Sequence, residues 1–106
     1  MLFNFGKKKF ESIGVNDIGC KLGKIELIDV REKNEYSMGH ITTAKNIPLA
    51  IILSDADKYL DKTKQYYVVC QSGGRSNMAC QELSYKGYNV VNVEGGTGRY
   101  KDKLER

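Results

Sequence analysis

The chain lacks most features of secreted, membrane and metal-binding proteins. Its 106 residues include three cysteines, one histidine and no tryptophan. An odd number of cysteines without a C-x-x-C pair argues against a disulfide framework and against a zinc site. We therefore expect no metal or cofactor, and a reducing, cytoplasmic setting. No apolar run approaches the roughly 20 residues of a membrane-spanning helix. At this length we expect one domain with a single core.

The first nine residues differ from the remainder in charge order. A short apolar patch precedes Lys7-Lys8-Lys9, whereas a secretory signal has the reverse order. We expect residues 1–9 to be a flexible basic N-terminus and residues 10–106 to form the domain. The net charge of +4 comes without a basic stripe interleaved with aromatic residues. This pattern predicts no nucleic-acid or membrane partner, but some attraction for small anions.

One stretch concentrates the candidate chemistry. Residues 66–69 are two tyrosines and two β-branched valines, as in a buried strand, and Cys70 follows directly. Gly73 and Gly74 supply the freedom that a tight loop needs, and a helix follows from Ser76. Such a loop can turn successive amides inward at a helix N-terminus and so form an anion cradle. The cradle should lower the pKa of Cys70, which makes this residue a candidate nucleophile.

Strands alternate with helices along the remainder of the chain, which predicts a parallel sheet covered on both faces. Parallel strands place ligands at their carboxyl ends, so residues 29–31, 70–76 and 94–98 should meet at one edge. The expected strands are 10–13, 24–30, 42–48, 66–69 and 90–93. The expected helices are 16–23, 32–38, one or two within 49–60, 76 to a stop at Gly87, and 99–106.

Several single residues are expected to have structural roles. Arg31 and Glu35 lie four apart, and an exposed ion pair between them would brace the loop after the second strand. His40 is expected to bond backbone or a carboxylate rather than to act in catalysis. The remaining expectations concern burial: Cys20 half-buried, Cys80 in the core, and one apolar helix face formed by Met78, Ala79, Leu83 and Tyr85.

Separate stretches resemble the rhodanese-like domains. The first signature matches at Asp29-Val30-Arg31, Glu35-Tyr36, Gly39-His40-Ile41, Ala44 and Asn46-Ile47-Pro48; the active-site loop matches at Cys70-Gln71-Ser72-Gly73-Gly74-Arg75-Ser76; the closing section matches at Leu83, Gly87-Tyr88 and Val93-Glu94-Gly95-Gly96. The resemblance implies a three-layer α/β/α sandwich on a five-stranded parallel sheet. Two departures are Thr43, where the family usually has glycine, and Tyr100, where tryptophan is common.

The resemblance also implies sulfurtransferase chemistry. Sulfane sulfur would pass from thiosulfate or a persulfide donor to Cys70, and from the Cys70 persulfide to cyanide or a thiol acceptor. The loop from Gln71 to Ser76 would bind the donor, with Arg75 orienting its charge. Asp29, Arg31, Glu35 and His40 would support the loop. A protein could be the sulfur acceptor.

Two other functions stay open. A cysteine phosphatase or arsenate reductase would also use cysteine, an amide cradle and arginine, but its loop holds five residues between them. Here four residues separate Cys70 from Arg75, and Val69 stands where a histidine would precede the cysteine. The other alternative is a persulfide carrier or interaction module that serves a protein partner.

Overall fold

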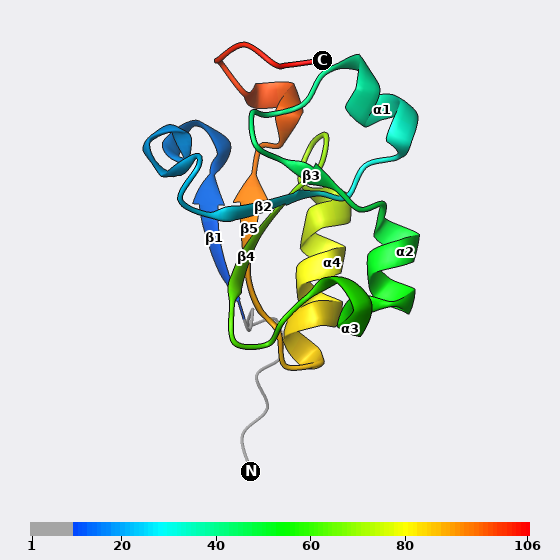
Figure 1. Ribbon diagram of the computed structural model, residues 1–106. Helices are drawn as coiled ribbons and strands as arrows, with labels where there is room; N and C mark the ends of the chain where they lie inside the picture. Colours follow the sequence, from blue (N-terminus) through cyan, green and yellow to red (C-terminus); the bar gives the residue numbers. More distant parts are fainter. Residues whose placement is uncertain (1–9) are drawn as a thin grey trace.

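The computed structural model describes residues 10–106; the expected flexible segment 1–9 lies outside the described residues. Five parallel strands form one sheet in the order β1-β5-β4-β2-β3. This confirms the expected five-stranded parallel sheet (Figure 1). The strands are β1 (Glu11–Gly14), β2 (Glu26–Asp29), β3 (Lys45–Asn46), β4 (Gln65–Val69) and β5 (Asn89–Glu94).

Helices and turns cover the sheet on both faces. One face packs against α2 (Leu49–Ser54), α3 (Ala56–Tyr59) and α4 (Gly74–Tyr85), which Figure 1 shows together on one side. The other face is covered by α1 (Lys33–Met38), by the 3-10 turns η1 (Val15–Asp17), η2 (Gly19–Lys21) and η3 (Thr97–Arg99), and by the C-terminal segment.

The central strand β4 has apolar side chains on both faces because it is covered twice. Val68 belongs to the core beneath α4, and its neighbour Val69 belongs to the core on the other face. Successive strand residues point to opposite faces, so a continuous apolar run suits such a strand. The carboxyl end of β4 therefore emerges from the middle of the molecule, with Cys70 directly after it.

Helix α4 ends as the sequence predicts. Gly87 has a φ of +97°, and its N–H donates to the Ser84 carbonyl at 3.0 Å. The N–H of Tyr88 donates to the Leu83 carbonyl at 3.0 Å. These two bonds form a Schellman motif, in which glycine adopts the left-handed conformation without a Cβ penalty.

Two expected helices are wrong. Residues 16–23 form η1 and η2 instead of a helix, because glycines at 19 and 23 weaken helix formation and Leu22 is extended. Residues 99–106 form no α-helix; the chain after η3 is extended. His40 and Glu105 exchange backbone hydrogen bonds of 2.8 and 2.7 Å as an antiparallel bridge. This bridge and the packing of Leu104 on the core outweigh the local preference of a polar segment for helix.

The structure also corrects some burial predictions. The buried face of α4 consists of Ser76, Ala79, Cys80 and Leu83. Met78 and Tyr85, expected on that face, are 54% and 82% exposed. Cys20 is exposed because η2 turns it outward, whereas Cys80 is buried as expected. The third strand is only the two residues of β3, since Pro48 and the turn at Thr43 limit it.

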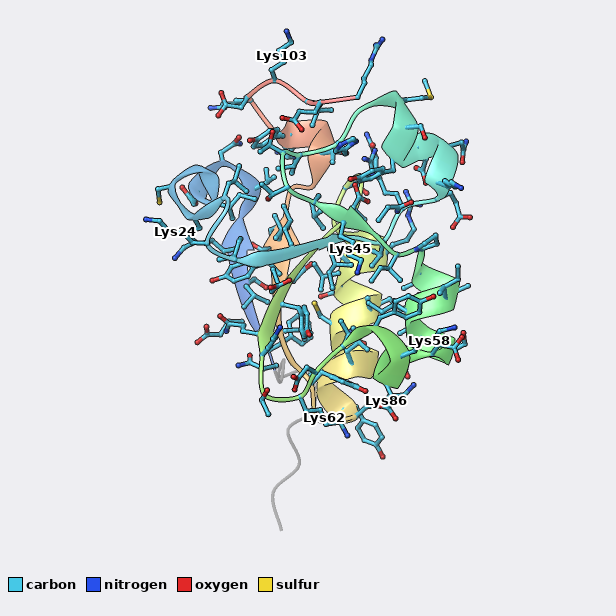
Figure 2. All side chains as sticks on the ribbon, in the orientation of Figure 1. Lys24, Lys45, Lys58, Lys62, Lys86 and Lys103 are labelled. Carbon is cyan, nitrogen blue, oxygen red and sulfur yellow. The ribbon has the colours of Figure 1, made fainter. Side chains whose placement is uncertain are left out.

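The lysines of the described chain are spread over several elements. Figure 2 labels Lys58, Lys62 and Lys86 around α3 and the C-terminal end of α4. The twelve residues of α4 put about 18 Å between that end and the cysteine loop. This basic group is therefore separate from the loop after β4. No helix within residues 10–106 has the length and apolar character that crossing a membrane requires.

Candidate active site

Cys70 lies at the base of a short loop that joins β4 to α4. Its Sγ accepts hydrogen bonds from the Gly73 amide at 3.1 Å and the Ser76 amide at 3.3 Å. The Cys70 thiol donates to Ser76 Oγ at 3.4 Å, and that hydroxyl donates to the Gly73 carbonyl at 3.1 Å. Gly73 has a φ of +111°, which turns its amide toward the sulfur. The loop therefore surrounds one sulfur atom with hydrogen-bond donors.

This arrangement favours the thiolate. Burial by itself raises the pKa of Cys70, but the Ser76 hydroxyl and the loop amides of Ser76, Gly73 and Ser72 outweigh it. The pKa of Cys70 therefore lies below its ordinary value. A cysteine whose pKa is lowered in this way is a candidate nucleophile that needs no neighbouring base.

A second glycine-rich loop, after β5, holds the cysteine loop in place. The amide of Thr97 donates to the Cys70 carbonyl at 2.9 Å, and that of Gly98 donates to the Gln71 carbonyl at 2.8 Å. Thr97 Oγ1 also donates to Gln71 Oε1 at 3.0 Å. The Gln71 side chain is thus tied to the second loop. Sequence reasoning placed this loop at the edge but missed Gly96 and Thr97 as supports; the glycine pair after a strand was the available signal.

Arg75 makes a paired contact with Glu35 of α1. Its Nη1 donates to Glu35 Oε1 at 2.6 Å and its Nη2 donates to Oε2 at 2.9 Å. The hydrogen bond from Arg75 and that from the Glu32 amide lower the pKa of Glu35 to about 2. The expected pair between Arg31 and Glu35 is wrong, because Glu35 reaches across to the cysteine loop and Arg31 turns inward.

Arg31 forms a buried ion pair with Asp29. Arg31 Nε lies 3.0 Å from both carboxylate oxygens of Asp29, and Nη2 donates to Oδ2 at 2.8 Å. The same Nη2 donates to the Gly39 carbonyl at 2.7 Å. Asn46 donates to the carbonyls of Asp29 and Arg31 at 3.0 and 2.9 Å. This network fixes the path of the chain after β2 and so positions α1 beside the loop.

His40 has a structural environment. Its Nδ1 lies 2.9 Å from the Tyr36 carbonyl, and its ring stacks on the Tyr36 ring at 3.8 Å between centroids. Its backbone joins the bridge to Glu105. The ring is therefore held by α1 and the C-terminal segment, as expected for a histidine bonded to backbone.

A hollow of about 400 Å³ adjoins the outer side of the loop. It is lined by Ser72, Gly73, Gly74, Asn77, Asn92, Glu94 and Gly95. Asn92 is buried in β5, and its Oδ1 has no hydrogen-bond partner among the described residues. Ser72 and Gly74 are exposed at the rim. An incoming molecule could reach the loop from this side.

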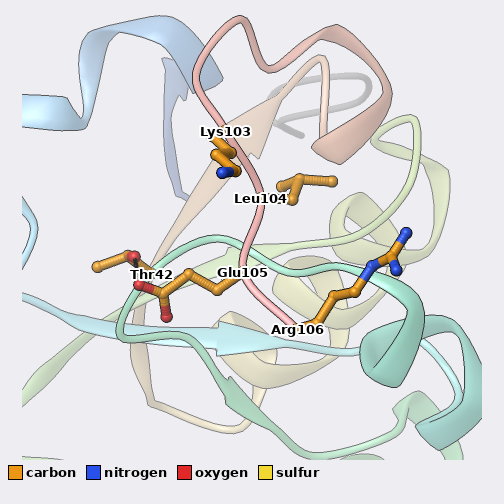
Figure 3. Close-up of a pocket in the computed structure, with 5 residues that line it drawn as sticks. All are labelled: Thr42, Lys103, Leu104, Glu105 and Arg106. Carbon is orange, nitrogen blue, oxygen red and sulfur yellow. Dashed lines mark hydrogen bonds between the residues drawn. The ribbon is translucent and has the colours of Figure 1, made fainter.

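A larger hollow of about 780 Å³ lies elsewhere, between Thr42 and the C-terminal residues 103–106 (Figure 3). Thr42 donates to the Glu105 carboxylate across it. The lining contains no cysteine. We therefore place the candidate active site at Cys70 and not in the larger hollow.

Cys80 is the other buried thiol. Burial, and then the charge of Cys70, raise the pKa of Cys80 to about 12. A thiol with such a pKa stays protonated and is a poor nucleophile. Within residues 10–106, no cluster of three or more histidine, cysteine, aspartate or glutamate side chains could hold a metal ion.

Comparison with known proteins shows to which family a chain with this cysteine loop belongs. Residues 17–103 match the family model described as "Rhodanese-like domain". The chain belongs to the rhodanese-like domain family. Bacillus subtilis "Putative sulfurtransferase YtwF" is 42% identical over 73 residues, which cover 69% of this chain and 70% of the relative. "Putative sulfur carrier protein YrkF" of the same organism is 34% identical over 82 residues; the match covers 76% of this rhodanese-like domain but 44% of the relative.

A solved structure also resembles this rhodanese-like domain over almost all of its length. The crystal structure of SSP1007 from Staphylococcus saprophyticus is 36% identical, with a TM-score of 0.81, and the match covers 92% of this chain and 100% of that one. The two departures from the family pattern can be located here. Thr43 has a φ of +71°, a conformation that suits glycine. Tyr100 packs against the core beneath η1 and η3.

Proposed function

We propose that this rhodanese-like domain is a sulfurtransferase that carries sulfane sulfur as a persulfide on Cys70. The observation that carries the proposal is the pair of amides, from Gly73 and Ser76, that donate to one sulfur atom, with the Ser76 hydroxyl in contact with the same sulfur. These donors stabilise the thiolate, and after transfer they can stabilise the charge of the terminal sulfur. Such a carrier needs a free thiol, and we place the reaction in the cytoplasm.

The proposed reaction has two steps. In the first, the Cys70 thiolate attacks the outer sulfur of thiosulfate or of a persulfide donor. A new S–S bond forms at Cys70 while the S–S bond of the donor breaks, and sulfite or a thiolate leaves with the electron pair. In the second step, cyanide or a thiolate acceptor bonds to the outer sulfur, the S–S bond at Cys70 breaks, and Cys70 leaves with the electron pair as the thiolate.

The remaining site residues have positioning roles in this proposal. Ser72 and Gly74 form the rim of the hollow beside the loop, and Gln71 anchors the loop through Thr97. Arg75 links the loop to α1 through Glu35. Asp29, Arg31 and His40 hold the chain that leads into α1 and away from it.

A phosphatase or arsenate reductase fits this loop less well. Both would need a cradle for a tetrahedral oxyanion, and here the amides of Gly73 and Ser76 converge on the sulfur itself at 3.1 and 3.3 Å. A carrier that passes sulfur to a protein partner uses the same persulfide. The name of the relative YrkF supports this version as a second candidate.

Mass spectrometry of the thiosulfate-treated protein tests the proposal. We expect the peptide with Cys70 to gain one sulfur atom, and cyanide to remove it as thiocyanate. Cys70→Ser should abolish the gain, whereas Cys80→Ser should retain it, because Cys80 is buried and protonated. Release of phosphate from an aryl phosphate without any sulfur on Cys70 would contradict the proposal.

A further inference from the structure

Glu35 is fixed in place independently of Arg75. Glu35 and Glu32 form a capping box at the start of α1, in which each side chain accepts the backbone N–H of the other. The Glu32 amide donates to Glu35 Oε1 at 2.9 Å. A capping box satisfies helix amides that would otherwise lack partners, so it holds the carboxylate for reasons of local structure. Glu35 therefore presents a permanent negative charge to the cysteine loop.

The Glu35 carboxylate forms an ion pair with Arg75, the cationic residue of the loop. Both terminal nitrogens of Arg75 donate to Glu35, at 2.6 and 2.9 Å. This bidentate pair engages two of the five N–H donors of the guanidinium and balances its positive charge. An incoming anion would meet an arginine whose charge is already balanced by a carboxylate that its own helix holds in place.

The second arginine near the loop is also neutralised. Arg31 pairs with the buried Asp29, and its Nη2 also donates a hydrogen bond to the Gly39 carbonyl. The four side chains therefore contribute two positive and two negative charges. With the Cys70 thiolate added, these five groups carry one net negative charge. The lysines at the far end of α4 are about 18 Å from the cysteine loop along the helix, which exceeds the Debye length of about 8 Å in physiological salt.

This balance affects thiosulfate and persulfide donors differently. Thiosulfate is a dianion and is repelled by the Cys70 thiolate. Neither Arg75 nor Arg31 offers an unpaired positive charge to offset this repulsion, because each pairs with a carboxylate. A protonated persulfide, R–S–SH, brings no such charge to the reacting sulfur. We propose that Glu35 determines the donor class of this site, by masking Arg75 and so favouring persulfide donors over inorganic dianions. This inference rests on the proposed function.

The favoured step balances without another reactant. The Cys70 thiolate attacks the outer sulfur of R–S–SH and forms the S–S bond of Cys70–S–SH. The donor S–S bond breaks, and R–S⁻ leaves with the electron pair and takes up a proton from solvent. Charge and sulfur oxidation state are conserved, since one sulfane sulfur changes carrier.

The test compares two donors on the full chain: thiosulfate, and the hydropersulfide of 2-mercaptoethanol, whose organic group is uncharged. Persulfide formation on Cys70 is followed by peptide mass spectrometry at several donor concentrations. Glu35→Gln keeps an acceptor for the Glu32 amide but removes the charge. We expect its kcat/KM for thiosulfate to rise about 5-fold or more, mainly through KM. The value for the hydropersulfide should not rise in parallel, so the ratio of the two kcat/KM values is the readout.

Three matched variants separate charge from structure. Glu35→Asp keeps the charge, so its preference for thiosulfate should stay as low as in the wild type. Glu11→Gln makes the same charge change at the start of edge strand β1 and should leave both donors unaffected. In Glu35→Gln combined with Arg75→Leu, the gain for thiosulfate should disappear, because no cation remains to be unmasked.

An unchanged or lower kcat/KM for thiosulfate in Glu35→Gln, with the hydropersulfide still active, would overturn the role of Glu35 alone. An equal gain in Glu35→Asp or in Glu11→Gln would also overturn it. Failure of wild-type Cys70 to accept sulfur from either donor would instead overturn the proposed function, and this inference with it.

Discussion

Gly96 lies against the backbone of Cys70 with no space for a side chain between them. A methyl group on Gly96 would come within 3.0 Å of the carbonyl oxygens of both Cys70 and Gln71. Gly96 also has a φ of +61°. The close approach allows the next residues, Thr97 and Gly98, to bond those carbonyls. The second loop thus sets the shape of the first.

Gly96→Ala should therefore displace the cysteine loop. We expect a loss of unfolding free energy on the order of 2–4 kcal/mol, from the left-handed conformation and the overlap with backbone. Urea denaturation measures this loss, and persulfide formation on Cys70 should fall with it. Gly19→Ala is the control, because a Cβ there has no atom within 4 Å. An equally small effect in both variants would contradict the assigned contact.

The reactivity of Cys70 should depend on pH through the Ser76 hydroxyl. Only the thiolate is alkylated, so the rate should rise with pH through an inflection below the value of about 8.5 for a free thiol. Ser76→Ala removes a hydrogen bond that lowers the pKa of Cys70, and should move the inflection upward. Peptide mass spectrometry must follow Cys70 separately, because Cys20 is exposed.

Cys80→Ser is the matched control for this measurement, since Cys80 is buried and should not alter the inflection of Cys70. An inflection for wild-type Cys70 near that of a free thiol would show that the loop does not stabilise the thiolate.

The buried pair of Asp29 and Arg31 should be costly to break from either side. Asp29→Asn leaves the Arg31 charge buried, and Arg31→Met leaves the Asp29 charge buried. Each should lower the unfolding free energy by about 3–5 kcal/mol. The double variant Asp29→Val, Arg31→Met should lose less than the two single variants combined, because it leaves no unpaired charge. Additive losses in urea denaturation would contradict a direct coupling.

Thr43→Gly should stabilise the protein. Thr43 is β-branched and has a φ of +71°. Relief of the left-handed conformation, less the greater flexibility of glycine in the unfolded chain, should raise the unfolding free energy by about 0.5–1 kcal/mol. Thr42→Gly, at the neighbouring position with its bond to Glu105, should be destabilising instead. A thermal melt of both variants distinguishes these outcomes.

Asn92→Val should be neutral or stabilising, although the residue is buried. Asn92 Oδ1 has no hydrogen-bond partner within residues 10–106, and removing an unsatisfied buried polar atom can recover about 1 kcal/mol. Asn46→Val should lose about 1–3 kcal/mol, since Asn46 donates to two carbonyls in the network around Asp29. Equal losses in the two variants would indicate that Asn92 has a structural bond after all.

The sequence by itself determined the elements with strong local signals. The apolar run before Cys70 predicted β4, and Gly87 predicted the end of α4, because both depend on neighbouring residues. The alternation of strands and helices then predicted a parallel sheet with three loops at one edge. The spacing between Cys70 and Arg75 predicted a cradle of the size of one sulfur atom.

Only the tertiary structure decided which charges pair. Arg31 and Glu35 are suitably spaced on the chain, yet Arg31 pairs with the buried Asp29, and Glu35 pairs with Arg75 of α4, 40 residues away. The C-terminal segment likewise forms a β-bridge between Glu105 and His40 instead of the expected helix. The partner of Glu35 and the path of the C-terminal segment depend on contacts between distant parts of the chain. For the same reason, the pairing of Arg75 with Glu35 could not be predicted from residues 70–76 alone.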